Sequence, residues 1–268
     1  MTARLIRRAG ALTLAAAATA TVLTGCGAGV GAKLTYDDTE KAKITDIVID
    51  GSSGDVAITT GAAAETRIKR TVRTDGRDPE ISHHVTGSTL DVSTSCGDHC
   101  TVSYEITAPV GVKVKGSLDS GDLTLSKVGS ADVRAGSGDI LLDQIPGDVI
   151  ARADSGSIQA NALGGGTTLV AKSGDVMAHE LTGGKAVKVT VDSGDISVGL
   201  AQPASVTARA SSGDINLVVP VGDYKIVGPA RRSDDGDELN TDLVSNPSAP
   251  NVLDLKASSG DASVVTSP

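Results

Sequence analysis

A three-residue motif, Ser-Gly-Asp, returns along this chain at an almost constant interval. Between Ser120 and Ser212 successive copies begin 17, 18, 18, 20 and 19 residues apart, and one copy is degenerate, Ser155-Gly156-Ser157. A period this regular indicates stacked units, because one short unit cannot bury its apolar face alone. The glycines and aspartates of the copies are Gly54, Asp55, Gly121, Asp122, Gly138, Asp139, Gly156, Gly174, Asp175, Gly194, Asp195, Gly213, Asp214, Gly260 and Asp261.

Apolar and polar residues alternate on both sides of each motif. Leu123 and Leu125 follow one copy, and Val187, Val189 and Val191 precede another. A period of two predicts a strand with one buried face, and the register counted from each serine does not slip between copies. We therefore predict an all-β fold, a single-stranded parallel β-solenoid with coils of 17–20 residues and an N-terminal β cap region.

The repeated glycine and aspartate are interpreted first as turn residues. Glycine tolerates a positive φ, and an aspartate side chain caps turn amides. Two chemical alternatives stay open, a carbohydrate-active enzyme that uses paired carboxylates and a ladder of Ca²⁺ sites. Against catalysis, the aspartates recur at equivalent positions, and three tyrosines are the only aromatic residues available to stack on sugars. We assign no catalytic residue, no metal and no cofactor.

The first 25 residues are typical of a lipoprotein signal peptide. Three arginines lie near the start, residues 9–22 are apolar, and Leu23-Thr24-Gly25-Cys26 resembles a bacterial lipobox. The sequence thus predicts lipidation of Cys26, with residues 26–36 forming the lipidated cysteine and a flexible tether. The expected location is extracytoplasmic, on the outer face of the cytoplasmic membrane. An ordinary secretory signal with a chance cysteine is the alternative.

The two remaining cysteines, Cys96 and Cys100, lie four residues apart between two strand-like segments. Outside the cytoplasm a pair this close favours a disulfide that pins a hairpin. Metal binding through Cys96, His99 and Cys100 is the alternative, although a fourth ligand is not in view.

The charge and the irregular segments constrain partners and domains. The formal net charge is −9, which argues against nucleic acid as a partner and leaves membrane attachment to the lipid. We expect an N-terminal β region over 37–110 and solenoid repeats over 111–268. The period breaks over 220–250, a charged and proline-containing segment that we interpret as a surface excursion, where function often lies.

These features together resemble a known family, the DUF4097 β-strand-repeat bacterial lipoproteins, which are also labelled candidate adhesins. The Ser-Gly-Asp-hydrophobic turns, the cysteine pair followed by residues 102–112, and the lipobox carry the resemblance. It implies an extracytoplasmic β-solenoid and supplies no catalytic residues. The expected function is a non-enzymatic surface lipoprotein for adhesion or cell-envelope interaction, with a cell-wall polymer or another envelope protein as partner. An accessory role in envelope-stress signalling is a further alternative.

Overall fold

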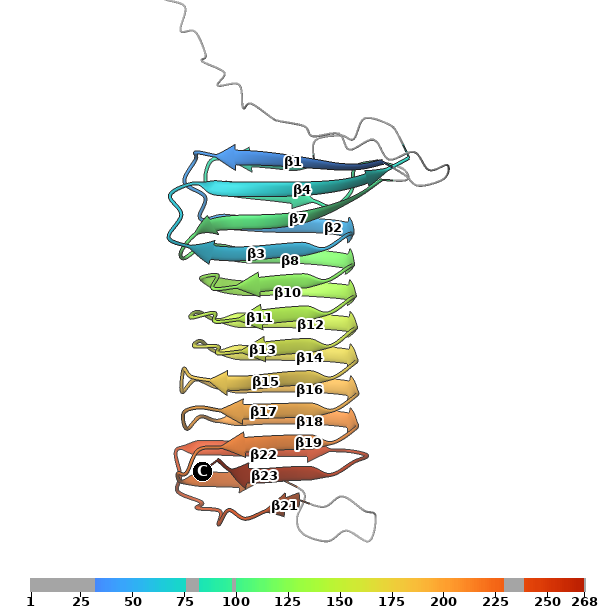
Figure 1. Ribbon diagram of the computed structural model, residues 1–268. Coiled ribbons are helices and arrows are strands. Elements are labelled where there is room, and N and C mark those ends of the chain that lie inside the picture. The colour runs from blue at the N-terminus through green and yellow to red at the C-terminus, as the bar shows by residue number, and fades with distance from the viewer. Residues whose placement is uncertain (1–31, 76–81, 98–99, 229–238, 268) are drawn as a thin grey trace, which may run out of the picture.

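The computed structural model describes residues 32–75, 82–97, 100–228 and 239–267, so Cys26 and the signal segment lie outside the described residues. The described chain is all-β and forms two mostly parallel sheets of 12 and 11 strands. The sheets face each other along the whole length of a rod, and nearly every coil adds one strand to each sheet (Figure 1). Within these residues no helix is long and apolar enough to cross a bilayer.

We name the two sheets A and B. Sheet A contains, in spatial order, β1 (Ala32–Glu40), β4 (Thr66–Thr74), β7 (Cys100–Pro109), β3 (Val56–Gly61), β9 (Leu123–Ser126), β11 (Ile140–Asp143), β13 (Ile158–Asn161), β15 (Val176–Leu181), β17 (Ile196–Leu200), β19 (Ile215–Val219), β23 (Ala262–Thr266) and β21 (Leu239–Thr241). Sheet B contains β20 (Tyr224–Val227), β22 (Asn251–Ala257), β18 (Val206–Ser212), β16 (Val187–Ser193), β14 (Thr167–Ser173), β12 (Val149–Ser155), β10 (Ser130–Ser137), β8 (Lys113–Ser120), β2 (Asp46–Ser53), β6 (Thr89–Ser93) and β5 (His83–Thr86).

The core is the narrow space between the two sheets, filled by the columns that the alternation predicted. Leu123 and Leu125 of sheet A are buried, as are Val187, Val189 and Val191 of sheet B. In sheet B equivalent residues pair without a register shift from β8 to β22, as in Val149–Thr167–Val187, and in sheet A the register shifts once, between Ala178 and Leu181 of β15. The predicted solenoid and its inward columns are confirmed. Small and branched side chains fill this core because the sheets lie close together.

The order of coils differs from the order of the sequence at the N-terminal end. The coil made by β2 and β3 lies between the coil of β8 and β9 and the coil of β6 and β7. Its first copy of the motif therefore stacks directly on the second, with Ser53 aligned to Ser120. Strands β1, β4 and β5 add antiparallel pairs beyond these coils and cover the end of the rod (Figure 1).

The C-terminal end shows the same kind of rearrangement. Strands β22 and β23 stack directly on β18 and β19, whereas β20 and β21, which precede them in sequence, lie outermost. The described part of the 220–250 segment thus covers the end of the stack, where we had expected an excursion from the surface. Burial explains this placement, because Tyr224 is enclosed and its hydroxyl donates to the Pro220 carbonyl at 3.0 Å. Residues 229–238 lie outside the described residues.

Candidate functional site at the disulfide end

The repeated aspartates form a ladder that joins successive coils. From Asp55 to Asp214, the Oδ1 of every aspartate of the motif accepts a hydrogen bond from the backbone N–H of the equivalent residue in the next coil, for example Asp122 from Asp139 at 2.9 Å and Asp195 from Asp214 at 2.8 Å. The degenerate Ser157 continues the ladder more weakly, accepting from the Asp175 amide at 3.4 Å. The sequence predicted turn capping, and the structure places the capped amide in the neighbouring coil.

The repeated glycines are required by both conformation and space. Gly138 and Gly174 have φ values of +132° and +136°, a region that residues with a side chain rarely adopt. A Cβ on Gly138 would lie 2.1 Å from the carbonyl oxygen of Gly121, and one on Gly174 would lie 2.3 Å from that of Gly156. Coils can stack at this corner only because the side chain is missing.

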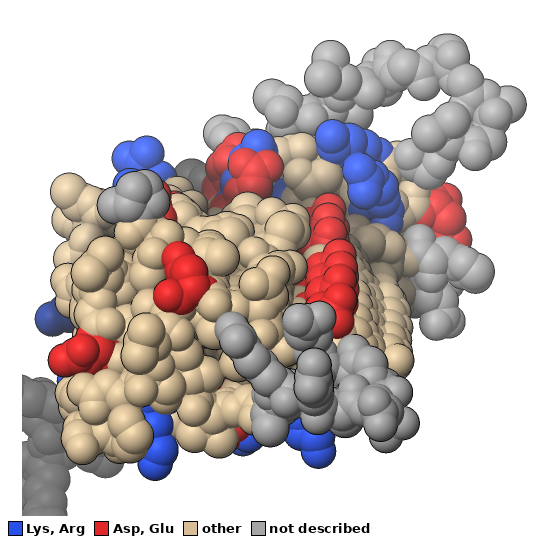
Figure 2. Space-filling view, turned by 90° about the horizontal axis from the view of Figure 1, so that it is seen from below, with Lys and Arg blue, Asp and Glu red and all other residues tan. Residues whose placement is uncertain are grey.

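The aspartate ladder is a structural element along one edge of the rod. Figure 2, which views the rod along its length, shows acidic side chains stacked in a straight row. Since the repeated carboxylates hold backbone amides, they do not form the isolated pair that glycoside hydrolysis uses. Across the described residues, no group of three or more histidines, cysteines or acidic residues is arranged to hold a metal ion.

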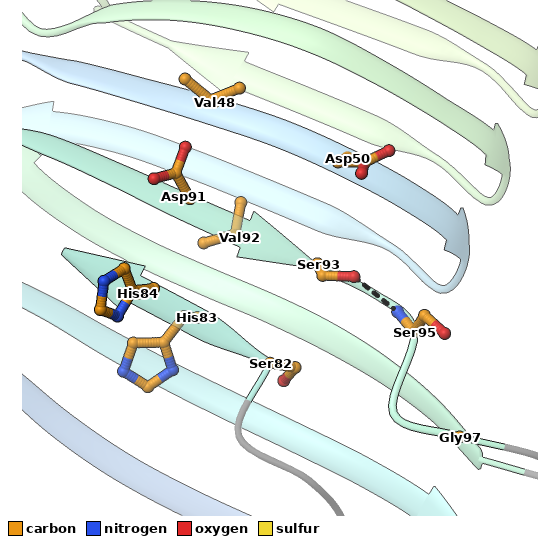
Figure 3. A pocket seen from close by; sticks show the side chains of 10 residues that line it. All are labelled: Val48, Asp50, Ser82, His83, His84, Asp91, Val92, Ser93, Ser95 and Gly97. Atoms are coloured by element: carbon orange, nitrogen blue, oxygen red, sulfur yellow. Dashed lines mark hydrogen bonds between the residues drawn. The ribbon is translucent and has the colours of Figure 1, made fainter. Parts of the chain in front are cut away.

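A hollow of about 640 Å³ lies near the disulfide, on the N-terminal part of sheet B. Strands β2, β5 and β6 and the segment after β6 supply its walls. Figure 3 shows Asp50 and Asp91 on adjacent strands, with His84 close to Asp91 on the edge strand. His84 and Asp91 are directly opposite each other in the antiparallel pair of β5 and β6. Hydroxyl groups of Ser93 and Ser95 line the same hollow.

The two carboxylates of the hollow differ from the ion-paired acids on sheet B. Asp132 pairs with Arg152 at 3.1 Å, and Asp154 pairs with Lys172 at 3.0 Å. The hydrogen bond from Arg134, and then that from Lys172, lower the pKa of Asp154. In the described part of the chain, neither Asp50 nor Asp91 has an ion pair or side-chain hydrogen bond.

His83 lines the hollow from the opposite side of β5. Its side chain is 11% exposed, its Nε2 lies 3.9 Å from Oδ2 of Asp38, and its Nδ1 is buried without a hydrogen-bond partner among the described residues. Burial lowers the pKa of His83, and the nearby Asp38 carboxylate opposes that effect. The imidazole is therefore held mainly in its neutral form at neutral pH.

A buried polar cluster supports the hollow from beneath. The Tyr104 hydroxyl donates to the Ser82 carbonyl at 2.7 Å and lies 2.5 Å from the Ser82 Oγ. Arg70 donates to the same Oγ at 3.4 Å, and its guanidinium lies 4.5 Å from the centre of the Tyr36 ring. Burial raises the pKa of Tyr104 to about 12, so this hydroxyl keeps its proton and remains a donor.

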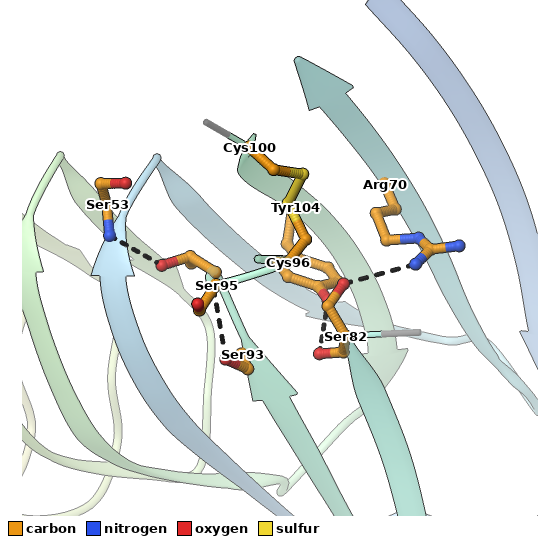
Figure 4. The surroundings of a disulfide bond; sticks show 9 residues. Ser53, Arg70, Ser82, Ser93, Ser95, Cys96, Cys100 and Tyr104 are labelled. Carbon is orange, nitrogen blue, oxygen red and sulfur yellow. Dashed lines mark hydrogen bonds between the residues drawn. A yellow bond between two sulfur atoms is a disulfide. The ribbon is translucent and has the colours of Figure 1, made fainter. Parts of the chain in front are cut away.

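The disulfide lies beside this cluster. Cys96 and Cys100 are bonded to each other with Cα atoms 5.5 Å apart, as the sequence predicted (Figure 4). The bond ties the start of β7 to the segment that contains Ser95 and Gly97, two residues of the hollow. Sulfurs bonded to each other are not thiolate ligands, so the alternative zinc-like site does not form in this state. His99 lies outside the described residues.

Sequence reasoning brought the glycine and aspartate columns together correctly and missed the hollow. Acidic residues at outward positions, Asp50 and Asp91, were visible in the alternation of two separate segments. The pairing of β2 with β6, more than 40 residues later, is a tertiary fact that no local pattern contains.

A family model and several solved structures are similar to this chain. The family model described as Toastrack DUF4097 matches residues 33–265. A candidate adhesin from Bacteroides fragilis is 13% identical, with coverage of 87% of this chain and 97% of that one and a TM-score of 0.44. A candidate adhesin from Parabacteroides distasonis is 18% identical, with coverage of 88% and 98% and a TM-score of 0.44. No curated protein matches the chain.

Proposed function

The chain belongs to the Toastrack DUF4097 family, and we propose that it is a non-enzymatic cell-envelope lipoprotein whose rigid β-solenoid makes adhesive contact with a cell-wall polymer. The observation that carries this proposal is the contrast between the outer faces of the two sheets. One face is almost free of charge over seven successive strands, whereas the other carries ion pairs along its length.

The outer face of sheet A is mostly neutral from β9 to β23, and Glu180 of β15 is an exposed acid outside its two aligned rows. At its two aligned outward rows the chain places no lysine or arginine and a single carboxylate, Asp143. The rows contain Thr124, Leu141, Gln159, Met177, Ser197, Asn216 and Ser263, and Ser126, Asp143, Asn161, His179, Gly199, Val218 and Val265. Leu141, Met177 and Val265 are each more than a third exposed.

Such a face suits a neutral, hydroxyl-rich polymer. Amide and hydroxyl side chains can hydrogen-bond to sugar hydroxyl and acetamido groups, and exposed aliphatic groups contribute apolar contact. The strands repeat about every 4.8 Å, so equivalent side chains offer the same group many times along the rod. Weak contacts of this kind add up when a polymer engages several coils at once.

A pelleting assay with purified cell walls tests the contact surface. We expect the soluble protein from residue 32 onward to sediment with the walls and a Met177→Lys/Val218→Lys variant to lose most of that binding. Thr190→Lys/Thr207→Lys, which adds the same charge to outward positions of sheet B, is the matched control and should bind normally. Equal binding by both variants, or no sedimentation of the parent protein, contradicts the proposal.

The anchor requires a separate test because Cys26 lies outside the described residues. The lipobox predicts that Cys26→Ala releases the protein from the membrane fraction and abolishes incorporation of a radiolabelled fatty acid. Retention of the variant in the membrane fraction would refute lipid anchoring without bearing on the contact surface.

The absence of an enzymatic role is supported by the engagement of the aspartate ladder with backbone amides. A screen of glycan substrates should give no turnover that depends on the ladder. Turnover that Asp139→Ala or Asp175→Ala abolishes, with the fold retained by circular dichroism, would overturn the non-enzymatic part of the proposal.

A further inference from the structure

We propose that two copies of this chain join at the N-terminal ends of their rods, with β1 of one copy paired antiparallel with β1 of the other. This inference goes beyond the proposed contact surface, which lies on later coils of sheet A. It rests on three features of β1: a long open edge, a pairing register that is complementary in charge, and partly buried apolar side chains at the same edge.

Strand β1 is the outermost strand of sheet A at the N-terminal end of the rod (Figure 1). Its nine residues pair with β4 without interruption, and across the described residues no strand pairs with its other side. An edge of this kind presents a row of backbone N–H and C=O groups that can pair with another strand. Proline and bulges often protect such edges, and β1 contains neither.

The C-terminal edge of sheet B is protected in a way that β1 is not. There the chain folds back over the outermost strand, β20, so that the Asn246 amide donates to the Tyr224 carbonyl at 2.8 Å and the Ile226 amide donates to the Ser245 Oγ at 3.0 Å. The other two edge strands, β5 and β21, have only four and three residues. Strand β1 is therefore the longest open edge in the described part of the chain.

The two faces of β1 restrict how a second copy can pair with it. Lys33 and Asp37, at odd-numbered positions, lie on the outer face, whereas Leu34 and Tyr36 lie on the inner face against the core. Directly opposite residues of antiparallel strands share a face. Only registers that pair odd with odd positions therefore keep the core faces of both copies on the same side of the joined sheet.

Among these registers, the one with Thr35 on the two-fold axis is complementary in charge. It places Lys33 of each copy opposite Asp37 of the other. Both side chains are exposed, and neither forms an ion pair within the described residues. Arg73, aligned with Lys33 on β4, adds positive charge beside the incoming carboxylate. An axis at Tyr36 would place Asp37 opposite Thr35, and an axis at Asp37 would oppose two carboxylates, which is unfavourable.

The same register joins apolar groups on the inner face. It places Leu34 opposite Tyr36 of the second copy, and in the single chain both side chains are only partly buried against the core. The Arg70 guanidinium, 4.5 Å from the centre of the Tyr36 ring, helps to hold that ring in place. Pairing would bury more of this apolar surface in addition to forming backbone hydrogen bonds. Because the interface is isologous, assembly stops at two copies.

Cysteine cross-linking of the full chain in cells tests the joint. Thr35→Cys places two thiols across the two-fold axis, where opposite Cα atoms lie about 4.5–5.5 Å apart, within the span of a disulfide. Thr39→Cys, on the same face of β1, is the matched control, because its two copies would lie about 27 Å apart. After oxidation with copper phenanthroline, non-reducing electrophoresis should show a dimer of Thr35→Cys and little dimer of Thr39→Cys.

The outcomes of this experiment separate the possible partners. Circular dichroism of the purified variants confirms that both are folded. Absence of a Thr35→Cys dimer, or equal dimer formation by the two variants, overturns the proposal. A product that joins Thr35→Cys to a different envelope protein overturns the assignment of a second copy as the partner.

Charge reversal tests the register independently. In the Thr35→Cys background, Lys33→Asp would oppose two carboxylates at each of two symmetric positions and should lower the dimer yield about tenfold. Adding Asp37→Lys should restore the yield, whereas Lys41→Asp, the same change at an exposed position beyond β1, should leave it unchanged. Failure of Asp37→Lys to restore cross-linking contradicts the register. Because none of these readouts involves cell walls, their failure leaves the contact-surface proposal standing.

Discussion

Replacing one glycine of the repeated motif should destabilise the whole rod, and Gly194→Ala in the middle of the repeat tests this. Gly194 has a φ of +135°, and a Cβ there would lie 2.5 Å from the carbonyl oxygen and 2.8 Å from the carbonyl carbon of Gly174. Both neighbours are backbone atoms of the adjacent coil and cannot rotate away. The substitution therefore forces the backbone out of its conformation or the two coils apart.

The expected loss of stability has two parts. Holding a residue with a side chain in this region of φ costs about 1–3 kcal/mol. Separating the coils weakens the hydrogen bonds from the Gly174 amide to the Ser193 carbonyl at 3.0 Å and from the Val176 amide to the Asp195 carbonyl at 2.9 Å, at about 1 kcal/mol each. The sum is about 3–5 kcal/mol, a large fraction of the about 5–15 kcal/mol by which proteins are usually stable.

Urea unfolding followed by far-ultraviolet circular dichroism measures this loss, since the chain has no tryptophan to report by fluorescence. With a slope of about 2–3 kcal/mol per molar, the midpoint should fall by about 1–2 M. Two controls separate the causes. Gly184 has a φ of +57°, and a Cβ there would have no neighbour nearer than 3.6 Å, so Gly184→Ala should lose about 1–2 kcal/mol of stability. A Cβ on Gly61 would lie in open space, so Gly61→Ala should change the stability little. If the urea midpoint of Gly194→Ala falls no further than that of Gly184→Ala, the close approach of the coils at the motif glycine does not add to the loss of stability, and the prediction is wrong.

Three more substitutions have defined outcomes. Val189→Asp places a carboxylate at a position with no exposure and should lower stability by several kcal/mol, whereas Thr190→Asp on the outward side of the same strand should be tolerated; similar urea midpoints would refute the inward register. Replacing both cysteines by serine opens a loop of five residues and should cost about 2 kcal/mol, and an unchanged midpoint would show that the bond contributes little. The pKa of His83 is lowered in the folded state by burial, while Asp38 and Glu40 oppose that effect and Arg70 and His84 reinforce it. Unfolding then gains a proton, so stability is fully present above the unfolded pKa of about 6.5 and is lost as the pH falls below it; His83→Gln should flatten this dependence, and an unchanged slope would contradict it.

The coils could be predicted because their information is local and repeated. Glycine at a corner with positive φ, aspartate beside it and two apolar positions in each strand report the same geometry many times, so errors at one copy are corrected by the others. Gly156 shows this, since its copy lacks the aspartate and still keeps the corner, with a φ of +148°. The disulfide was equally predictable, because Cys96 and Cys100 are four residues apart and have few other possible partners.

The ends of the rod and the hollow were less predictable. Nothing between Ser53 and Ser120 says that the chain leaves the stack after β3, builds β4 to β7, and returns to place β8 on the other side of β2. The copies of the motif at Gly54 and Gly260 indicated that their coils belong to the stack, because each motif packs against another copy in a neighbouring coil. They did not indicate which coil each of them stacks on.

What the sequence by itself determined is therefore the coil: its two strands, its glycine corner, its inward columns and the disulfide. These depend on contacts between residues close together or related by the period, and alternation and turn chemistry record such contacts directly. The tertiary structure alone decided which coil lies next to which at each end, and with that the meeting of Asp50, Asp91 and His83 around one hollow. Contacts across 40 residues or more depend on the free energy of burying whole strands against one another, which no single segment of the chain contains.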